Sequence, residues 1–174
     1  MTKKYILTDE TIIHDGRTLY RIKAIRDFGS VKKGDLGGFI ESEDNLSHEG
    51  NAWIGDYARV FGGAVIYGNA QVYGYAQVWG DAYVYGYAQV YGDALVFGKA
   101  QVYSYALVCG AARVYGYAQV FENARVYGDA HVYGDAQVYG NAQVYGNVCV
   151  GISARIPDAD SSRFDLLDES VGAS

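Results

Sequence analysis

Three histidines, His14, His48 and His131, are the side chains of this 174-residue sequence that would serve as a general base. A histidine base needs a second group that orients its ring and a cleft that excludes water. His14 and His48 fall in irregular segments near the amino terminus, whereas His131 shares a surface position with Arg113. Neither requirement is visible around His131. We therefore expect a solvated surface histidine, and His131 is the candidate base only if the protein is an enzyme.

Tyrosines supply a second kind of chemistry, because their rings stack on sugar rings and on bases. The chain has 18 of them. The densest group includes tyrosines at positions where Asn, Asp or Gly would suit a backbone turn, and it consists of Tyr83, Tyr85, Tyr87, Tyr103 and Tyr105. We predict that this group binds a partner subunit or a small ligand with a sugar ring or a base. Phosphate of a nucleotide-like ligand would be contacted by basic residues near the amino terminus, namely Arg17, Arg21, Lys32 and Lys33.

A third group of residues breaks the pattern of its surroundings by being apolar. Its members replace polar or larger side chains, and they are Leu95, Phe97, Leu107, Cys109 and Ala111. Contiguous exposed apolar side chains usually mark an interface. We therefore predict that the protein forms a homo-oligomer through these residues.

All of these residues belong to, or lie beside, one repeated six-residue phrase. Its plainest copies are residues 69–74 and 141–146, both of which read Asn-Ala-Gln-Val-Tyr-Gly. A fixed short period is typical of a solenoid. The composition agrees, since 23 Gly, 18 Tyr and one Pro are unusual for a globule with a Leu-, Ile- and Phe-rich core.

Each phrase has a small and an aliphatic position that lie two residues apart. The small position is Ala from residue 52 to residue 142, and the aliphatic position is Val or Ile from residue 54 to residue 156. In a strand these side chains face the same way, so we assign them to the interior. The reverse assignment would bury Gln, Arg and His at about 2 kcal/mol or more each. Gly followed by a turn residue then forms a corner every six residues, and three corners make an 18-residue coil.

The spacing in Val72-Tyr73-Gly74-Tyr75-Ala76-Gln77 resembles the hexapeptide repeat of left-handed parallel β-helix proteins. This resemblance implies an all-β, triangular β-solenoid of about six coils. The superfamily also implies acyl transfer from an acyl-CoA, with a histidine acting between subunits of a trimer. Such enzymes usually interrupt a coil with a loop that carries the histidine or walls the pocket, and no insertion breaks the register between residues 52 and 156.

The ends of the chain have a different character from the repeat. Residues 1–50 are predicted to form an N-terminal β cap and a first irregular coil, because His14-Asp15-Gly16-Arg17 between apolar runs is a hairpin signal. Residues 51–156 form the β-helix, and the acidic residues 157–174 form a short C-terminal cap or tail. Parts of the cap also resemble poorly characterised solenoid proteins of bacteria and phages, notably residues 34–38, 45–47 and 50–53.

Composition excludes several functional classes. The net charge of −6 leaves no basic face for nucleic acid. No apolar run is long enough for a membrane span, and two cysteines build no disulfide framework, so we expect a cytoplasmic protein. One histidine in the repeat does not make a three-histidine zinc site, so no metal and no cofactor are expected. We predict a non-catalytic, oligomeric binding protein; the alternatives are a hexapeptide-repeat acyltransferase that uses acyl-CoA and a purely structural or protein-interaction solenoid.

Overall fold

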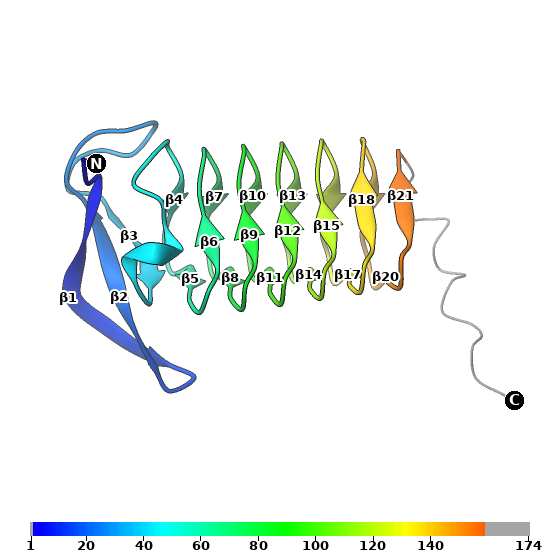
Figure 1. Cartoon of the computed structure of the whole chain (residues 1–174), viewed down its shortest axis with the longest axis horizontal. Helices are drawn as coiled ribbons and strands as arrows, with labels where there is room; N and C mark the ends of the chain where they lie inside the picture. The colour runs from blue at the N-terminus through cyan, green and yellow to red at the C-terminus, as the bar shows by residue number, and fades with distance from the viewer. Residues whose placement is uncertain (1, 159–174) are drawn as a thin grey trace, which may run out of the picture.

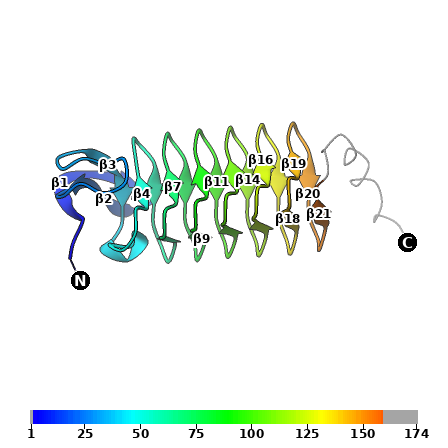
Figure 2. The same cartoon turned by 90° about the horizontal axis from the view of Figure 1, so that it is seen from above.

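The computed structural model describes residues 2–158 as a stack of three-sided coils. A β-hairpin lies at the N-terminal end of the stack, and the coils follow one another along its long axis (Figures 1 and 2). Most of the predicted C-terminal cap lies outside the described residues. Within residues 2–158, no helix is long and apolar enough to cross a membrane.

Three sheets form the sides of the stack, and we call them sheets I, II and III. Sheet I contains β4 (Trp53–Ile54), β7 (Gln71–Val72), β10 (Gln89–Val90), β13 (Leu107–Val108), β16 (Arg125–Val126) and β19 (Gln143–Val144). Sheet II contains β1 (Tyr5–His14), β2 (Arg17–Ala24), β3 (Leu36–Ile40), β5 (Arg59–Val60), β8 (Gln77–Val78), β11 (Leu95–Val96), β14 (Arg113–Val114), β17 (His131–Val132) and β20 (Cys149–Val150). Sheet III contains β6 (Val65–Ile66), β9 (Tyr83–Val84), β12 (Gln101–Val102), β15 (Gln119–Val120), β18 (Gln137–Tyr139) and β21 (Arg155–Pro157). A single 3-10 turn, η1 (Glu43–Asn45), precedes the regular coils in the described chain.

Neighbouring strands of the repeat pair in parallel, and each residue lies opposite the equivalent residue of the next coil. In sheet I, for example, Val90 is the partner of Val72 on one side and of Val108 on the other. The triangular parallel solenoid predicted from the repeat is therefore confirmed. The stack has about 7 turns. They comprise the regular coils predicted from the hexads and the predicted first irregular coil, which begins at β3, where Ile40 pairs with Val60.

The core runs continuously through the stack. The Ala and Val/Ile positions assigned to the interior are fully buried through the regular coils, as the 0% exposure of Ala76 and Val78 illustrates. The glycines of the corners adopt a left-handed backbone: Gly74 has φ +71°, and a Cβ on it would lie 3.0 Å from the amide nitrogen of Gly92. Glycine is required there both for its φ angle and for the close approach of the next coil.

Aromatic rings form three ladders on the outside of the corners, because residues 18 apart in the sequence lie above one another in the stack. One ladder has centroid spacings of 4.8, 4.9, 5.0 and 5.2 Å along Tyr67, Tyr85, Tyr103, Phe121 and Tyr139. A second runs from Phe61 through Trp79, Phe97 and Tyr115 to Tyr133. The third contains the stacked pairs Tyr73–Tyr91 and Tyr127–Tyr145, with Cys109 between them. Stacking of this kind stabilises a parallel sheet by roughly 0.2–1 kcal/mol per pair.

The predicted hairpin cap is confirmed. His14 pairs with Arg17 across a turn in which Asp15 and Gly16 have φ angles of +49° and +75°. Strand β2 then pairs antiparallel with β3, which pairs in parallel with β5. The hairpin therefore continues sheet II beyond its first parallel strand, β3. A small second core, made of Leu19, Phe39 and Phe61 with Ile12 and Trp79, joins the hairpin to the outside of the coils.

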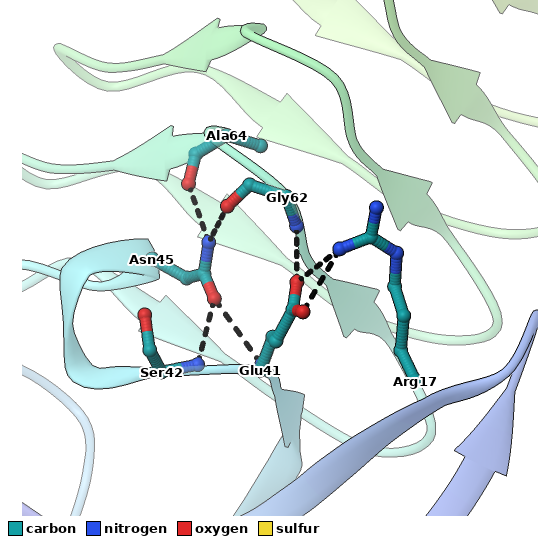
Figure 3. Close-up of polar contacts among 6 residues, drawn as sticks. All are labelled: Arg17, Glu41, Ser42, Asn45, Gly62 and Ala64. Atoms are coloured by element: carbon teal, nitrogen blue, oxygen red, sulfur yellow. Dashed lines mark hydrogen bonds and ion pairs between the residues drawn. The ribbon is translucent and has the colours of Figure 1, made fainter.

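Two polar side chains attach the first turn to the regular coils (Figure 3). The side-chain nitrogen of Asn45 donates to the backbone carbonyls of Gly62 and Ala64. Its side-chain oxygen accepts from the backbone amides of Glu41 and Ser42. The Glu41 carboxylate accepts from the Gly62 amide at 2.7 Å and pairs with Arg17 at 2.8 Å. These contacts satisfy backbone groups that the irregular turn leaves without ladder partners.

A buried lysine closes the N-terminal end of the core. The Lys4 ammonium is fully buried and donates to the carbonyls of Ala52 at 2.8 Å, Gly50 at 3.3 Å and Glu49 at 3.4 Å. Burial, with a smaller contribution from Arg26, lowers the pKa of Lys4 to about 8. The neighbouring Tyr5 hydroxyl donates to the Leu46 carbonyl at 2.7 Å, and burial raises the pKa of that phenol.

Candidate functional site

The densest tyrosine group lies where sheet III turns into sheet I, and we call it the aromatic corner: Tyr83, Tyr85, Tyr87, Tyr103 and Tyr105. Strand β9 carries Tyr83, and the residues that follow β9 and β12 supply the other four. Tyr85 stacks on Tyr103 at 4.9 Å, and Tyr87 stacks on Tyr105 at 5.1 Å. The structure thus brings all five predicted residues together on neighbouring coils.

The inner pair of this corner has a structural role. The Tyr85 hydroxyl donates to the Gln101 side chain at 3.3 Å, and the Tyr103 hydroxyl donates to Gln119 at the same distance. Burial is the main cause that raises the pKa of both phenols. The same bond recurs where sheet I turns into sheet II, from Tyr73 to Gln89 and from Tyr127 to Gln143, so it belongs to the architecture of the repeat.

The outer pair departs from the repeat. Tyr87 and Tyr105 are 55% and 63% exposed, and the corresponding turn positions of the coils on either side hold Asn51, Asn69, Asn123 and Asn141. Directly before Tyr105, Ser104 replaces the corner glycine and has a φ angle of +58°. A non-glycine residue in this region costs roughly 1–2 kcal/mol, and such strain gathers at functional sites. Sequence reasoning missed Ser104, although the break in the regular glycine positions was a visible signal.

Two of the other three exposed corner tyrosines, Tyr57 and Tyr117 but not Tyr75, carry a cation over a ring. Tyr57 stacks on Tyr75 at 5.5 Å where sheet I turns into sheet II, and the Arg21 guanidinium lies 5.5 Å from the Tyr57 ring centre. Tyr117 lies where sheet II turns into sheet III, and the Lys99 ammonium lies 5.2 Å from its ring centre. No such contact to Tyr87 or Tyr105 occurs within residues 2–158.

Two of the three histidines are held by contacts at both ring nitrogens. His14 contacts the Gln77 side-chain oxygen at 3.0 Å and the Arg59 guanidinium at 3.3 Å. His48 accepts from the Lys4 amide at 3.3 Å and contacts Glu43 at 3.1 Å. These rings have no nitrogen free to take a proton from a substrate while the contacts persist.

His131 is placed differently from the other two histidines. It lies on the outside of sheet II, between Arg113 and Cys149 in the strand register. Its ring meets the edge of Tyr115 at 6.3 Å. Within the described chain, no hydrogen bond to a carboxylate orients the His131 ring. Residues 2–158 therefore supply no carboxylate that orients His131 as a base.

Four of the five residues of the apolar break lie around the corner between sheets I and II. Leu95 lies on β11 in sheet II and Leu107 on β13 in sheet I, while Cys109 and Ala111 occupy the turn between these sheets. Phe97 belongs to the ladder at another corner, between Trp79 and Tyr115. Four of these five side chains are half-buried, and Ala111 alone is exposed.

The four basic residues predicted to contact phosphate also lie apart. Arg17 is paired with Glu41, and Arg21 lies over the rings of Phe39 and Tyr57. Lys32 contacts Asp27 at 3.6 Å on the exposed loop that precedes β3, and Lys33 follows it there. The structure brings none of them to the aromatic corner. Within residues 2–158, no three His, Cys, Asp or Glu side chains gather in a group that could hold a metal ion.

Comparison with known proteins supports the architecture. Residues 88–104, 118–134 and 136–151 match a family described as the YdcK β-solenoid repeat. A stretch of 52 residues is 54% identical to an Escherichia coli (strain K12) protein named "Uncharacterized acetyltransferase YdcK". This stretch covers 29% of the chain and spans only 16% of the relative's length. The resemblance to hexapeptide-repeat solenoids is thus confirmed, and the phage origin stays a prediction.

Proposed function

We propose that this protein is a non-catalytic β-solenoid that binds a small ligand through the aromatic corner. The observation that carries the proposal is the exposed, stacked pair Tyr87–Tyr105, in turn positions where the neighbouring coils hold asparagine. The repeat folds without tyrosine at these positions, so the pair is not needed for the coil itself. Exposed aromatic rings are preferred anchors in binding surfaces.

The chemistry of the corner favours binding over catalysis. Its exposed groups are rings and hydroxyls, which stack on planar or ring-shaped groups. Two histidines are occupied by structural contacts, and the third lies on sheet II, away from the corner. Sugar rings and nucleotide-like molecules both fit the stacking chemistry. Assembly into a homo-oligomer through the apolar residues around Leu107 is part of the proposal.

Native mass spectrometry of protein purified from the expressing cells tests this proposal. The wild-type protein is expected to retain a small molecule, and the variant Tyr87→Asn/Tyr105→Asn to lose it. Asparagine is the residue that the repeat itself uses at this position, so the variant should fold normally. Tyr117→Asp is the matched control, because Asp81 and Asp135 occupy the equivalent position on other coils. A bare wild-type mass, or equal retention by the double variant, refutes the proposal, and the same spectra report the oligomeric state.

A second candidate function is acyl transfer, which the printed name of the Escherichia coli relative favours. It would use acetyl-CoA as donor, with His131 as the base. Incubation with acetyl-CoA and a set of amine and hydroxyl acceptors measures it directly. Transfer that disappears in His131→Ala would establish this function and reject the non-catalytic one.

A further inference from the structure

The exposed corner tyrosines share a pattern that extends beyond stacking. Where sheet I turns into sheet II, the pair Tyr57–Tyr75 receives the Arg21 guanidinium on Tyr57. Where sheet II turns into sheet III, Tyr117 receives the Lys99 ammonium from the equivalent turn position of the preceding coil. A cation over a tyrosine face is attracted by the negative charge of the π system. The chain thus places its own cations over Tyr57 and Tyr117, at two of its three corners, whereas Tyr75 receives none from the described residues.

At the third corner, the pair Tyr87–Tyr105 has faces that are available in the same way. The two rings are stacked with an interplanar angle of 7°, so the outer face of Tyr105 points along the stack toward the next turn position, Asn123. Asn123 is exposed and makes no side-chain hydrogen bond to any described residue. Asn123 lies one coil beyond Tyr105, just as Asp135 lies one coil beyond Tyr117. A ligand group about as thick as a ring therefore fits above Tyr105 by continuing the stack.

The charges at this corner determine which kind of ligand group would be attracted to Tyr105. The corner segments of the described chain between sheets III and I contain Glu49, Glu122 and Asp158, and no lysine or arginine. Glu122 precedes Asn123 directly and is exposed; one of its carboxylate oxygens accepts from the Gly140 amide at 2.7 Å. A phosphate would be repelled at this place, whereas a cation would be attracted both by the ring and by Glu122.

We infer that the outer face of Tyr105, bordered by Asn123 and Glu122, binds a guanidinium or alkylammonium group. This inference rests on the proposed function and names its ligand class. The group belongs either to a free organic cation or to an arginine or lysine side chain of a partner protein. The ring of Tyr87 stacks on Tyr105 from the other side.

Titration with defined cations, followed by NMR at low ionic strength, tests the inference. Agmatine and spermidine are the free cations, a hexa-arginine peptide stands for a protein partner, and AMP and maltohexaose are the anionic and neutral comparisons. We expect at least one cation to bind, and Tyr87→Asn/Tyr105→Asn to weaken it about threefold to thirtyfold. Binding of agmatine or spermidine would show that a free organic cation is sufficient for binding. Binding of the peptide alone would indicate that the cationic group belongs to a protein partner.

Two charge variants make the test specific. Asn123→Lys places an ammonium group beside Tyr105, as Lys99 does beside Tyr117, so it should block the added cation to a similar extent as the double tyrosine variant. Asp135→Lys adds a lysine at another corner and should have little effect. If no cation binds, or if all variants bind the cations equally, the inference is wrong. If AMP or maltohexaose binds instead and Tyr87→Asn/Tyr105→Asn abolishes that binding, the inference fails while the proposed function stands.

Discussion

The buried ammonium of Lys4 should make the stability of the protein rise with pH in the mildly alkaline range. Lys4 is fully buried, and its pKa is lowered from 10.5 to about 8, first by burial and then by Arg26. The unfolded chain therefore holds this proton over a range in which the folded chain has released it, and stability increases with pH wherever the unfolded state binds more protons. One unit of pKa difference corresponds to about 1.4 kcal/mol. Between pH 7 and pH 9.5 the expected gain in the free energy of unfolding is about 2 kcal/mol.

Urea unfolding of wild-type protein and Lys4→Met at several pH values measures this effect. The fluorescence of Trp53, which lies 6.5 Å from the Tyr5 ring, reports on the cap. The wild-type stability should rise relative to Lys4→Met up to pH 9.5. Above pH 10 the raised pKa of Tyr5 acts in the opposite direction, because the unfolded chain then loses its phenolic proton first. Lys3→Met is the control, since Lys3 is exposed and paired with Glu43. A constant difference between wild type and Lys4→Met from pH 7 to pH 9.5 would refute the reasoning.

Three further predictions concern the coils. Val102→Asp places a carboxylate between Val84 and Val120 in a fully buried position and should cost about 4 kcal/mol or more, seen as loss of the folded circular dichroism spectrum; a soluble, cooperatively folded variant would contradict it. Glu41→Gln should make the free energy of unfolding fall less steeply as the pH is lowered. The Gly62 amide and Arg17 lower the pKa of Glu41 in the folded protein, so the stabilisation by this carboxylate is lost as the pH falls through the glutamate range. An unchanged pH dependence of unfolding in acid would count against this prediction. Ser104→Gly should raise the free energy of unfolding by up to about 1 kcal/mol by relieving φ +58°, measured by urea unfolding, and a lower value would show that the serine side chain stabilises the turn.

The sequence was sufficient to predict most of the fold, because each hexad position has one physical role. Alanine and valine two residues apart define the interior, and the glycine that follows defines the corner. The first turn was predicted as an irregular coil, but its attachment was not, because Asn45 and Glu41 bind the next coil through side-chain bonds that no periodic pattern reveals. The same limit applies to Lys4, whose three carbonyl partners are distant from it in the sequence.

The candidate site was predictable to a smaller extent. The five tyrosines of the aromatic corner were found because the length of one coil, read from the repeat, places Tyr87 directly before Tyr105 in the stack. The apolar break was predicted around one corner, and Leu95, Leu107, Cys109 and Ala111 lie there, whereas Phe97 follows β11 and belongs to the ladder of the next corner. The basic residues of the cap were grouped by their closeness in sequence, whereas the hairpin directs Arg17 toward Glu41 and Arg21 toward two aromatic rings.

Departures from the repeat separate into two kinds when their contacts are considered. Asp56 and Glu122 replace corner glycines at φ +52° and +59°, and each accepts a hydrogen bond from the corner amide of the next coil, on Gly74 and Gly140. These bonds offset the backbone strain and explain the acids structurally. Ser104 has the same backbone strain and makes no side-chain hydrogen bond within the described chain, and it directly precedes the exposed Tyr105. Ile152, at φ +41°, is a second corner residue of this kind. Backbone strain that no local hydrogen bond offsets gathers at functional sites, and at Ser104 it supports the proposal that the aromatic corner binds a ligand.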